Sequence, residues 1–168
     1  MSLQQPWSVQ KILVPVDFSS CSRRALSYAA FWGARMGAQL DVLHVVSEPP
    51  SYGSMDVISL SMPQAGVRSF RDYAHQLAKD EMGAFLDSCS LPEGLKPNLS
   101  FVDGSPTHSI LNVAEEHHYD LIVMGTHGRT GLSHALIGSV AERVLRKAPC
   151  PVLTVRQGVH APAIAAHG

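Results

Sequence analysis

The 168-residue sequence has few of the features that mark several broad classes of protein. It contains only three cysteines, at positions 21, 89 and 150. An odd number at wide spacing argues against a disulfide framework or a zinc site and favours a reducing compartment. No apolar run approaches the roughly 18 residues of a membrane span. The N-terminal residues lack the basic segment and apolar stretch of a signal peptide, so we expect a cytoplasmic protein.

Charged residues are also scarce. They make up 16% of the chain, and the net charge at pH 7 is −1. Such a chain has no broad basic field for nucleic acid or an anionic membrane, so we expect neither as a partner. Any anion site must therefore be local. The apolar fraction of 45% is typical of a well-packed globular protein.

Strand-like and helix-like segments alternate along the chain. Short apolar, β-branched runs predict strands at 11–17, 39–46, 99–104, 120–126 and 151–155. Apolar residues at helical spacing predict helices at 19–37, 67–88, 105–117 and 139–147. Serines are expected to cap the first, third and fourth of these helices: Ser19 or Ser20, Ser105 and Ser139.

The length and the absence of an internal repeat favour one domain, which we place at residues 10–156. Residues 1–9 are expected to be an N-terminal extension, and residues 157–168 a flexible tail of small, weakly polar residues. Residues 47–65 form a long irregular stretch, which is uncommon inside a compact domain unless it works as a lid or is mobile.

The alternation predicts an α/β fold, with a mostly parallel sheet covered by helices on both faces in a doubly wound arrangement. Such folds bind ligands beyond the carboxyl ends of the strands, where the winding direction reverses. In the common five-strand orders, the third or the fourth strand lies across this crevice from the first. If it is the fourth, Asp17 and the loop after the fourth strand face the same crevice.

That loop, GTHGRTGLSHALIGS, spans residues 125–139 and contains four glycines. Glycines let backbone N–H groups approach a ligand, and the start of the next helix adds unpaired N–H groups and partial positive charge. Together they predict a phosphate cradle that needs no net charge. Hydroxyl and guanidinium groups can add donors: Thr126, Arg129, Thr130, Ser133 and Ser139. The alternative is a mobile connector whose glycines only serve turns.

Two common phosphate-binding motifs are missing. The dinucleotide fingerprint needs G-x-G-x-x-G after the first strand, where this chain reads VDFSSCS. The P-loop needs G-x-x-x-x-G-K-[ST], and no lysine follows a glycine in residues 125–139. Neither NAD binding nor P-loop phosphoryl transfer is therefore indicated.

The spacing Gly125-x2-Gly128-x9-Gly138-Ser139 resembles the nucleotide-binding signature of the universal stress protein family, of the UspA-like, ATP-binding type. The segments ILVPVDFS, YDLIVMGTHGRTGL and GSVAERVLRKAPCPVLTV agree with it, and the resemblance covers about residues 10–156. It implies a Rossmann-like fold of the adenine nucleotide alpha hydrolase type, with a five-stranded parallel sheet in the order 3-2-1-4-5. It also implies binding of ATP, ADP or AMP, with or without Mg²⁺.

The resemblance further implies which residues contact the nucleotide. Asp17 would lie near the base or the ribose, and Val45 would meet adenine through its backbone. The glycines would admit ribose and phosphates, and Ser139 would bind phosphate oxygens. The full expected set is Pro15, Val16, Asp17, Val45, Met124, Gly125, His127, Gly128, Arg129, Gly138, Ser139 and Val140. The last strands of two copies, Pro151–Val155, would pair in a homodimer, as an apolar sheet edge and twofold symmetry favour.

Three functions stay open at this point. We favour a non-enzymatic nucleotide-binding regulatory module in the stress response, because no base, nucleophile or pair of carboxylates for metals can be identified. The first alternative is an enzyme in the same crevice, a slow ATP hydrolase or a nucleotidyl-group hydrolase. A catalytic His127 is disfavoured, because no partner for a catalytic arrangement is visible in the sequence. The second alternative is a dimeric scaffold that binds no nucleotide, with the glycine loop as an interaction surface. The alternative role for Asp17 alone is to cap the first helix.

Overall fold

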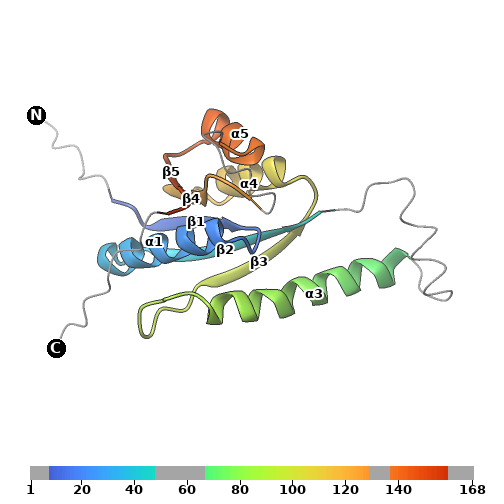
Figure 1. Ribbon diagram of the computed structural model, residues 1–168. Coiled ribbons are helices and arrows are strands. Elements are labelled where there is room, and N and C mark those ends of the chain that lie inside the picture. Colours follow the sequence, from blue (N-terminus) through green and yellow to red (C-terminus); the bar gives the residue numbers. More distant parts are fainter. Residues whose placement is uncertain (1–7, 48–66, 129–136, 159–168) are drawn as a thin grey trace, which may run out of the picture.

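The computed structural model describes residues 8–47, 67–128 and 137–158. Its elements are β1 (Lys11–Val16), α1 (Ser20–Met36), β2 (Gln39–Val46), α3 (Val67–Asp87), β3 (Asn98–Asp103), α4 (Pro106–Glu116), β4 (Leu121–Gly125), α5 (Ser139–Lys147) and β5 (Val152–Val155) (Figure 1). Each predicted strand and helix is present, with its ends within one residue of the expected bounds. The expected extension 1–9, irregular stretch 47–65 and tail 157–168 fall largely outside the described residues.

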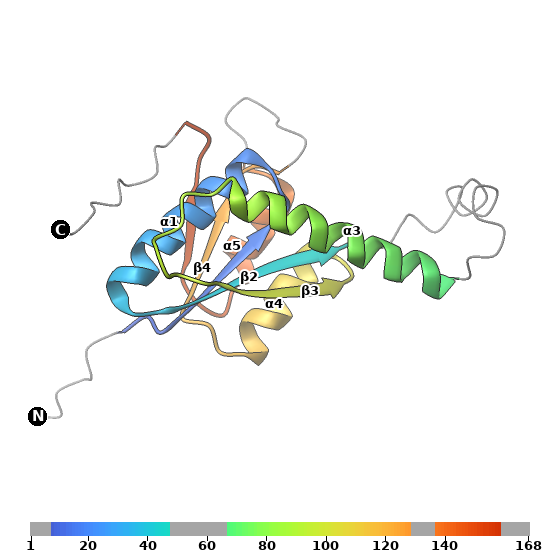
Figure 2. The ribbon, with the colours of Figure 1, turned by 90° about the horizontal axis from the view of Figure 1, so that it is seen from below.

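The strands form one parallel sheet in the order β3-β2-β1-β4-β5, which confirms the predicted fold class. Helices α1 and α3 cover one face, and α4 and α5 cover the other (Figure 1). Figure 2 shows α1 and α3 side by side across the same face. Since β2 and β3 extend from one side of β1 while β4 and β5 extend from the other, the winding reverses between β1 and β4.

The core consists of two apolar layers, one on each face of the sheet. Along β1, Ile12 and Val14 pack with α1 and α3, while Leu13 packs with α4 and α5. All three side chains are fully buried. A strand covered on both faces reads as a continuous apolar run, which explains the sequence of β1. The described helices include none long and apolar enough to cross a bilayer.

The helix ends agree only in part with the expected serine caps. The Ser19 hydroxyl caps α1, because it accepts a hydrogen bond from the Ser22 amide at 3.2 Å. Ser105 precedes α4, but its side chain makes no capping hydrogen bond. The prediction for Ser139 is wrong, because Ser139 is the first residue of α5 and Gly138 occupies the capping position. A residue with helical dihedrals cannot turn its hydroxyl back to the second or third amide as a capping residue does. Neither α4 nor α5 is therefore capped by the side chain at its capping position.

Candidate functional site

A cleft of about 550 Å³ opens at the carboxyl ends of β1, β2 and β4, where the winding reverses. Its volume lies within the range of small-molecule sites, roughly 300–1,000 Å³. Nearly all the residues expected at the nucleotide line it: Pro15, Val16, Asp17, Val45, Met124, Gly125, His127, Gly128, Gly138, Ser139 and Val140. Arg129 lies outside the described residues.

The cleft has further walls that sequence reasoning missed. One face of α3 contributes Ala74, Leu77, Ala78 and Glu81. The start of α4 contributes Pro106 and Ile110. No local pattern relates these helices to the loop after β4, since only the tertiary fold brings them there. A usable signal did exist for α4, because it follows β3 directly and must begin at the same edge of the sheet.

Asp17 follows β1 and bridges toward the loop after β4. Its Oδ1 accepts a hydrogen bond from the Ser19 amide at 3.1 Å. Its Oδ2 faces Gly128 so closely that a Cβ built there would lie 2.6 Å away. Asp17 is therefore not the capping residue of α1, which is Ser19. Its carboxylate instead lies in the wall of the cleft.

Besides Gly128, two more glycines of the loop, Gly125 and Gly138, have a steric cause within the protein itself. A Cβ at Gly125 would lie 2.9 Å from the carbonyl carbon of Cys21 in α1. A Cβ at Gly138 would lie 3.2 Å from the carbonyl oxygen of Thr126, which accepts a hydrogen bond from the Gly138 amide at 2.7 Å. The two ends of the loop are thus joined, and both open onto the cleft.

His127 contains a buried polar atom without a partner. Its Nδ1 lies 2.8 Å from Thr126 Oγ1, but its Nε2 is buried and has no hydrogen-bond partner among the described residues. An unpaired buried polar group costs about 1–3 kcal/mol, so such atoms are rare and often mark a functional site.

The starts of α4 and α5 both reach the cleft, through Pro106 and through Ser139, Val140 and Ala141. The first amides of a helix have no partner within the helix, and they carry partial positive charge. Because neither helix is capped by the side chain at its capping position, these amides suit an anion. The cleft also has apolar lining residues: Pro15, Leu43, Val45, Met124 and Ile110.

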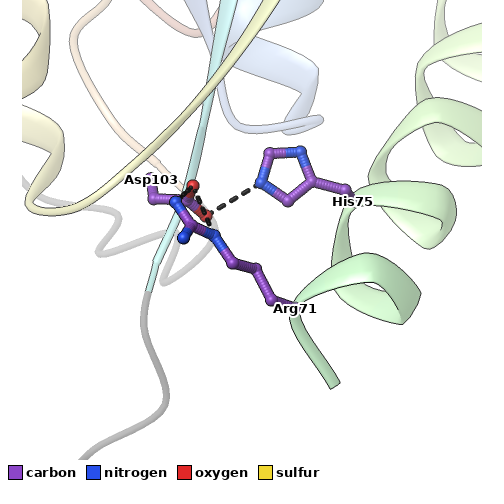
Figure 3. Close-up of polar contacts among 3 residues, drawn as sticks. All are labelled: Arg71, His75 and Asp103. Atoms are coloured by element: carbon purple, nitrogen blue, oxygen red, sulfur yellow. Dashed lines mark hydrogen bonds and ion pairs between the residues drawn. The ribbon is translucent and has the colours of Figure 1, made fainter. Parts of the chain in front are cut away.

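A polar cluster joins α3 to the carboxyl end of β3 (Figure 3). Both Arg71 and His75 contact the Asp103 carboxylate, with Arg71 Nε at 2.9 Å and His75 Nε2 at 2.8 Å. The guanidinium of Arg71 keeps the pKa of Asp103 below its usual value. The cluster lies next to Ala74 and Ala78, so it helps to place the wall of the cleft that α3 provides.

The opposite, amino end of the sheet holds a second polar cluster, around Asp41. This carboxylate is 7% exposed. It accepts hydrogen bonds from the side chains of Gln39 at 2.8 Å, Asn98 at 2.7 Å and Tyr119 at 2.7 Å. These donors come from β2, β3 and the residues before β4, so Asp41 links separate parts of the fold.

Comparison with known proteins gives consistent matches. The sequence profile of the universal stress protein family matches residues 8–156. Universal stress protein MJ0531 of Methanocaldococcus jannaschii is 33% identical over 88% of this chain and 82% of its own length. The solved structure of UspA from Lactobacillus plantarum has a TM-score of 0.70 at 28% identity, covering 89% of this chain and 99% of that chain. The solved structure of MJ0577 has a TM-score of 0.71 at 29% identity, covering 92% and 100%.

Proposed function

Because the chain belongs to the universal stress protein family, we propose that it binds an adenine nucleotide in the cleft at the carboxyl ends of β1 and β4. The ligand is ATP, ADP or AMP, with or without Mg²⁺. The protein acts as a regulatory module of the stress response, in which the bound nucleotide changes what the protein contacts. We place it in the cytoplasm, a proposal supported by three free cysteines.

The observation that carries the proposal is that the cleft combines apolar lining residues with the start of a helix and a carboxylate. Pro15, Val45 and Met124 suit an adenine ring, and the ring edge can reach the backbone of Val45. The start of α5 and the loop residues beside it suit phosphates, because they offer backbone N–H groups without a bulky side chain at Gly138. Asp17 also lines the cleft, where a carboxylate can accept hydrogen bonds from ribose hydroxyls.

Isothermal titration calorimetry with ATP, ADP, AMP and adenosine tests the proposal. We expect Asp17→Ala to weaken all four ligands by about tenfold, as loss of a hydrogen bond to a charged group does. Ser139→Ala should weaken ATP by about threefold and leave adenosine unchanged, since its hydroxyl faces the phosphates. Asp120→Ala is the matched control, because this aspartate also accepts backbone N–H groups, those of Gln10 and Lys11, at the other end of the sheet. No heat with any nucleotide, with and without Mg²⁺, would end the proposal.

One observation favours slow hydrolysis as a second candidate. The unpaired Nε2 of His127 is a group that a ligand can use, although no partner in a catalytic arrangement is visible among the described residues. Phosphate release should then fall in His127→Ala and in Asp17→Ala. Release at the wild-type rate in both variants would point to a contaminating enzyme.

We further propose a homodimer in which the β5 strands of two copies pair. Among the described residues β5 pairs only with β4, and Leu153 on β5 is 37% exposed. Antiparallel pairing of two identical edges satisfies twofold symmetry. Sedimentation equilibrium should give twice the chain mass for the wild type and the chain mass for Leu153→Glu. A monomeric wild type would contradict this assembly.

A further inference from the structure

The turn between β1 and α1 contains a strained residue directly after Asp17. Phe18 has a φ of 64°, in the left-handed region that residues with large side chains rarely adopt. Such backbone conformations persist only where the surrounding structure enforces them, and they gather at functional sites. Something in the fold must therefore hold Phe18 in place.

The imidazole of His44, on β2, holds both neighbours of Asp17. The Phe18 ring stacks on the His44 ring, with centroids 4.2 Å apart and planes at 25°. The Phe18 ring also meets the Phe85 ring of α3 edge-on at 5.6 Å. His44 Nδ1 lies 2.9 Å from the Val16 carbonyl oxygen. A carbonyl only accepts, so Nδ1 carries the proton of this hydrogen bond.

Phe18 lies outside the lining of the cleft, so its role does not depend on direct contact with a ligand. Asp17 and His44 line the cleft, but Phe18 does not. The carboxylate of Asp17 is directed toward Gly128 by the turn that follows it, in which its Oδ1 meets the Ser19 amide. Phe18 lies between Asp17 and Ser19, whose side chain and amide form this hydrogen bond. The backbone conformation of Phe18 therefore decides where the Asp17 carboxylate lies.

We propose that Phe18 is a positioning residue, whose ring, stacked on His44, holds the Asp17 carboxylate in the geometry that binds the nucleotide. The proposal rests on the nucleotide-binding function proposed above. Stacking offsets the strain of the left-handed backbone, and loss of the ring lets the turn relax into a conformation that L residues prefer. The Asp17 carboxylate then leaves the wall of the cleft, although no residue that contacts the ligand has been substituted.

A double-mutant cycle of ATP affinity tests this role. We expect Phe18→Ala to weaken ATP by about tenfold when Asp17 is present and by less than about twofold in the Asp17→Ala background. A residue that acts through Asp17 has nothing left to position once the carboxylate is gone. An equal loss in both backgrounds would show a general structural effect and overturn the proposal.

Two further variants separate the ring from the backbone. Phe18→Tyr keeps the stack and should bind ATP as the wild type does. Phe18→Gly lacks the ring but adopts a positive φ without strain, so it should be more stable than Phe18→Ala and lose less affinity. A Gly variant that shows the same loss with and without Asp17 would also overturn the proposal.

Phe101→Leu is the matched control. Phe101 meets the same His44 ring edge-on at 6.3 Å, but it lies on β3 and has no sequence neighbour at the cleft wall near Asp17. We expect it to lower stability and leave ATP affinity unchanged. If the wild type itself binds no nucleotide, the proposed function fails; if the wild type binds and the cycle is additive, only the role of Phe18 fails.

Discussion

Two buried polar groups at opposite ends of the sheet, the Asp41 carboxylate and His127 Nε2, differ in whether they are paired. At the amino end, the buried carboxylate of Asp41 is surrounded by donors from Gln39, Asn98 and Tyr119. At the carboxyl end, His127 Nε2 is buried without a partner among the described residues, and Phe18 has a strained backbone. The first arrangement stabilises the fold, whereas the second retains features that cost stability. Such features are expected where a ligand completes the structure.

The largest effect should come from Asp41→Ala. It removes the acceptor of three side-chain donors, so we expect a loss of about 3–4 kcal/mol in the free energy of unfolding. His127→Leu, at the other end, removes the unpaired Nε2 together with the single hydrogen bond between Nδ1 and Thr126 Oγ1, so it should cost only about 1 kcal/mol. Urea denaturation followed by circular dichroism measures both. Equal losses would mean that the two ends do not differ in this way.

Gly125→Ala should have the next largest effect. Gly125 lies at the carboxyl end of the sheet, where β4 approaches α1 closely. The added Cβ would meet the backbone of Cys21 at 2.9 Å, which cannot move as a side chain can. We expect a loss of about 2 kcal/mol from this overpacking. Gly83→Ala in α3 is the matched control, since its Cβ would meet nothing within 4 Å. It should stabilise the protein by up to about 1 kcal/mol, so a lower melting temperature would contradict the packing seen here.

Tyr119→Phe removes one donor from Asp41 and should cost about 1–1.5 kcal/mol at neutral pH. Burial raises the pKa of Tyr119, and the hydrogen bond to Asp41 raises it further. A raised pKa means that the folded state holds the proton more tightly, so this contribution is complete below the ordinary pKa near 10 and is lost as the pH rises above it. Unfolding free energies measured from pH 8 to 11 should fall more steeply for the wild type than for Tyr119→Phe. Parallel curves would contradict the shift.

Asp103→Asn should have the smallest effect. Arg71 lowers the pKa of Asp103, so the contribution is present above the ordinary pKa of an aspartate, about 3.9, and is lost as the pH falls below it. The guanidinium of Arg71 is 65% exposed, so solvent screens the pair and we expect a loss of less than about 0.5 kcal/mol at pH 7. In thermal melts at a series of pH values from 7 down to 2, the difference between Asp103→Asn and the wild type should shrink as the pH falls below about 3.9. A larger loss, unchanged by 0.5 M salt, would contradict the screening.

Local patterns predicted the elements well because each has a strong local cause. Gly37, with a φ of 65°, ends α1 where the sequence places it, and Ser19 caps the same helix. The cap expected at Ser139 is wrong, because the join between Gly138 and Thr126 decides where α5 begins. That hydrogen bond connects residues on either side of a loop, so a sequence pattern at the start of a helix cannot predict it.

The candidate site could be predicted where it depends on strand ends. In a parallel sheet the residues after neighbouring strands meet at one edge, so Asp17 and the residues around Gly125 were expected together. The wall from α3 could not be predicted, because a long connection separates that helix from β2. The strain at Phe18 was equally hidden, since a phenylalanine gives no local sign of a positive φ.

The order of apolar and polar residues alone determined the alternation of strands and helices, and with it the end of the sheet at which the cleft opens. These properties follow from short-range periodicity and from the geometry of parallel strands. Only the tertiary structure decided which polar groups are paired. Asp41 meets Tyr119 across 78 positions of sequence, and His44 reaches the Val16 carbonyl across 28, because hydrogen bonds and ring stacking depend on distance in space rather than along the chain.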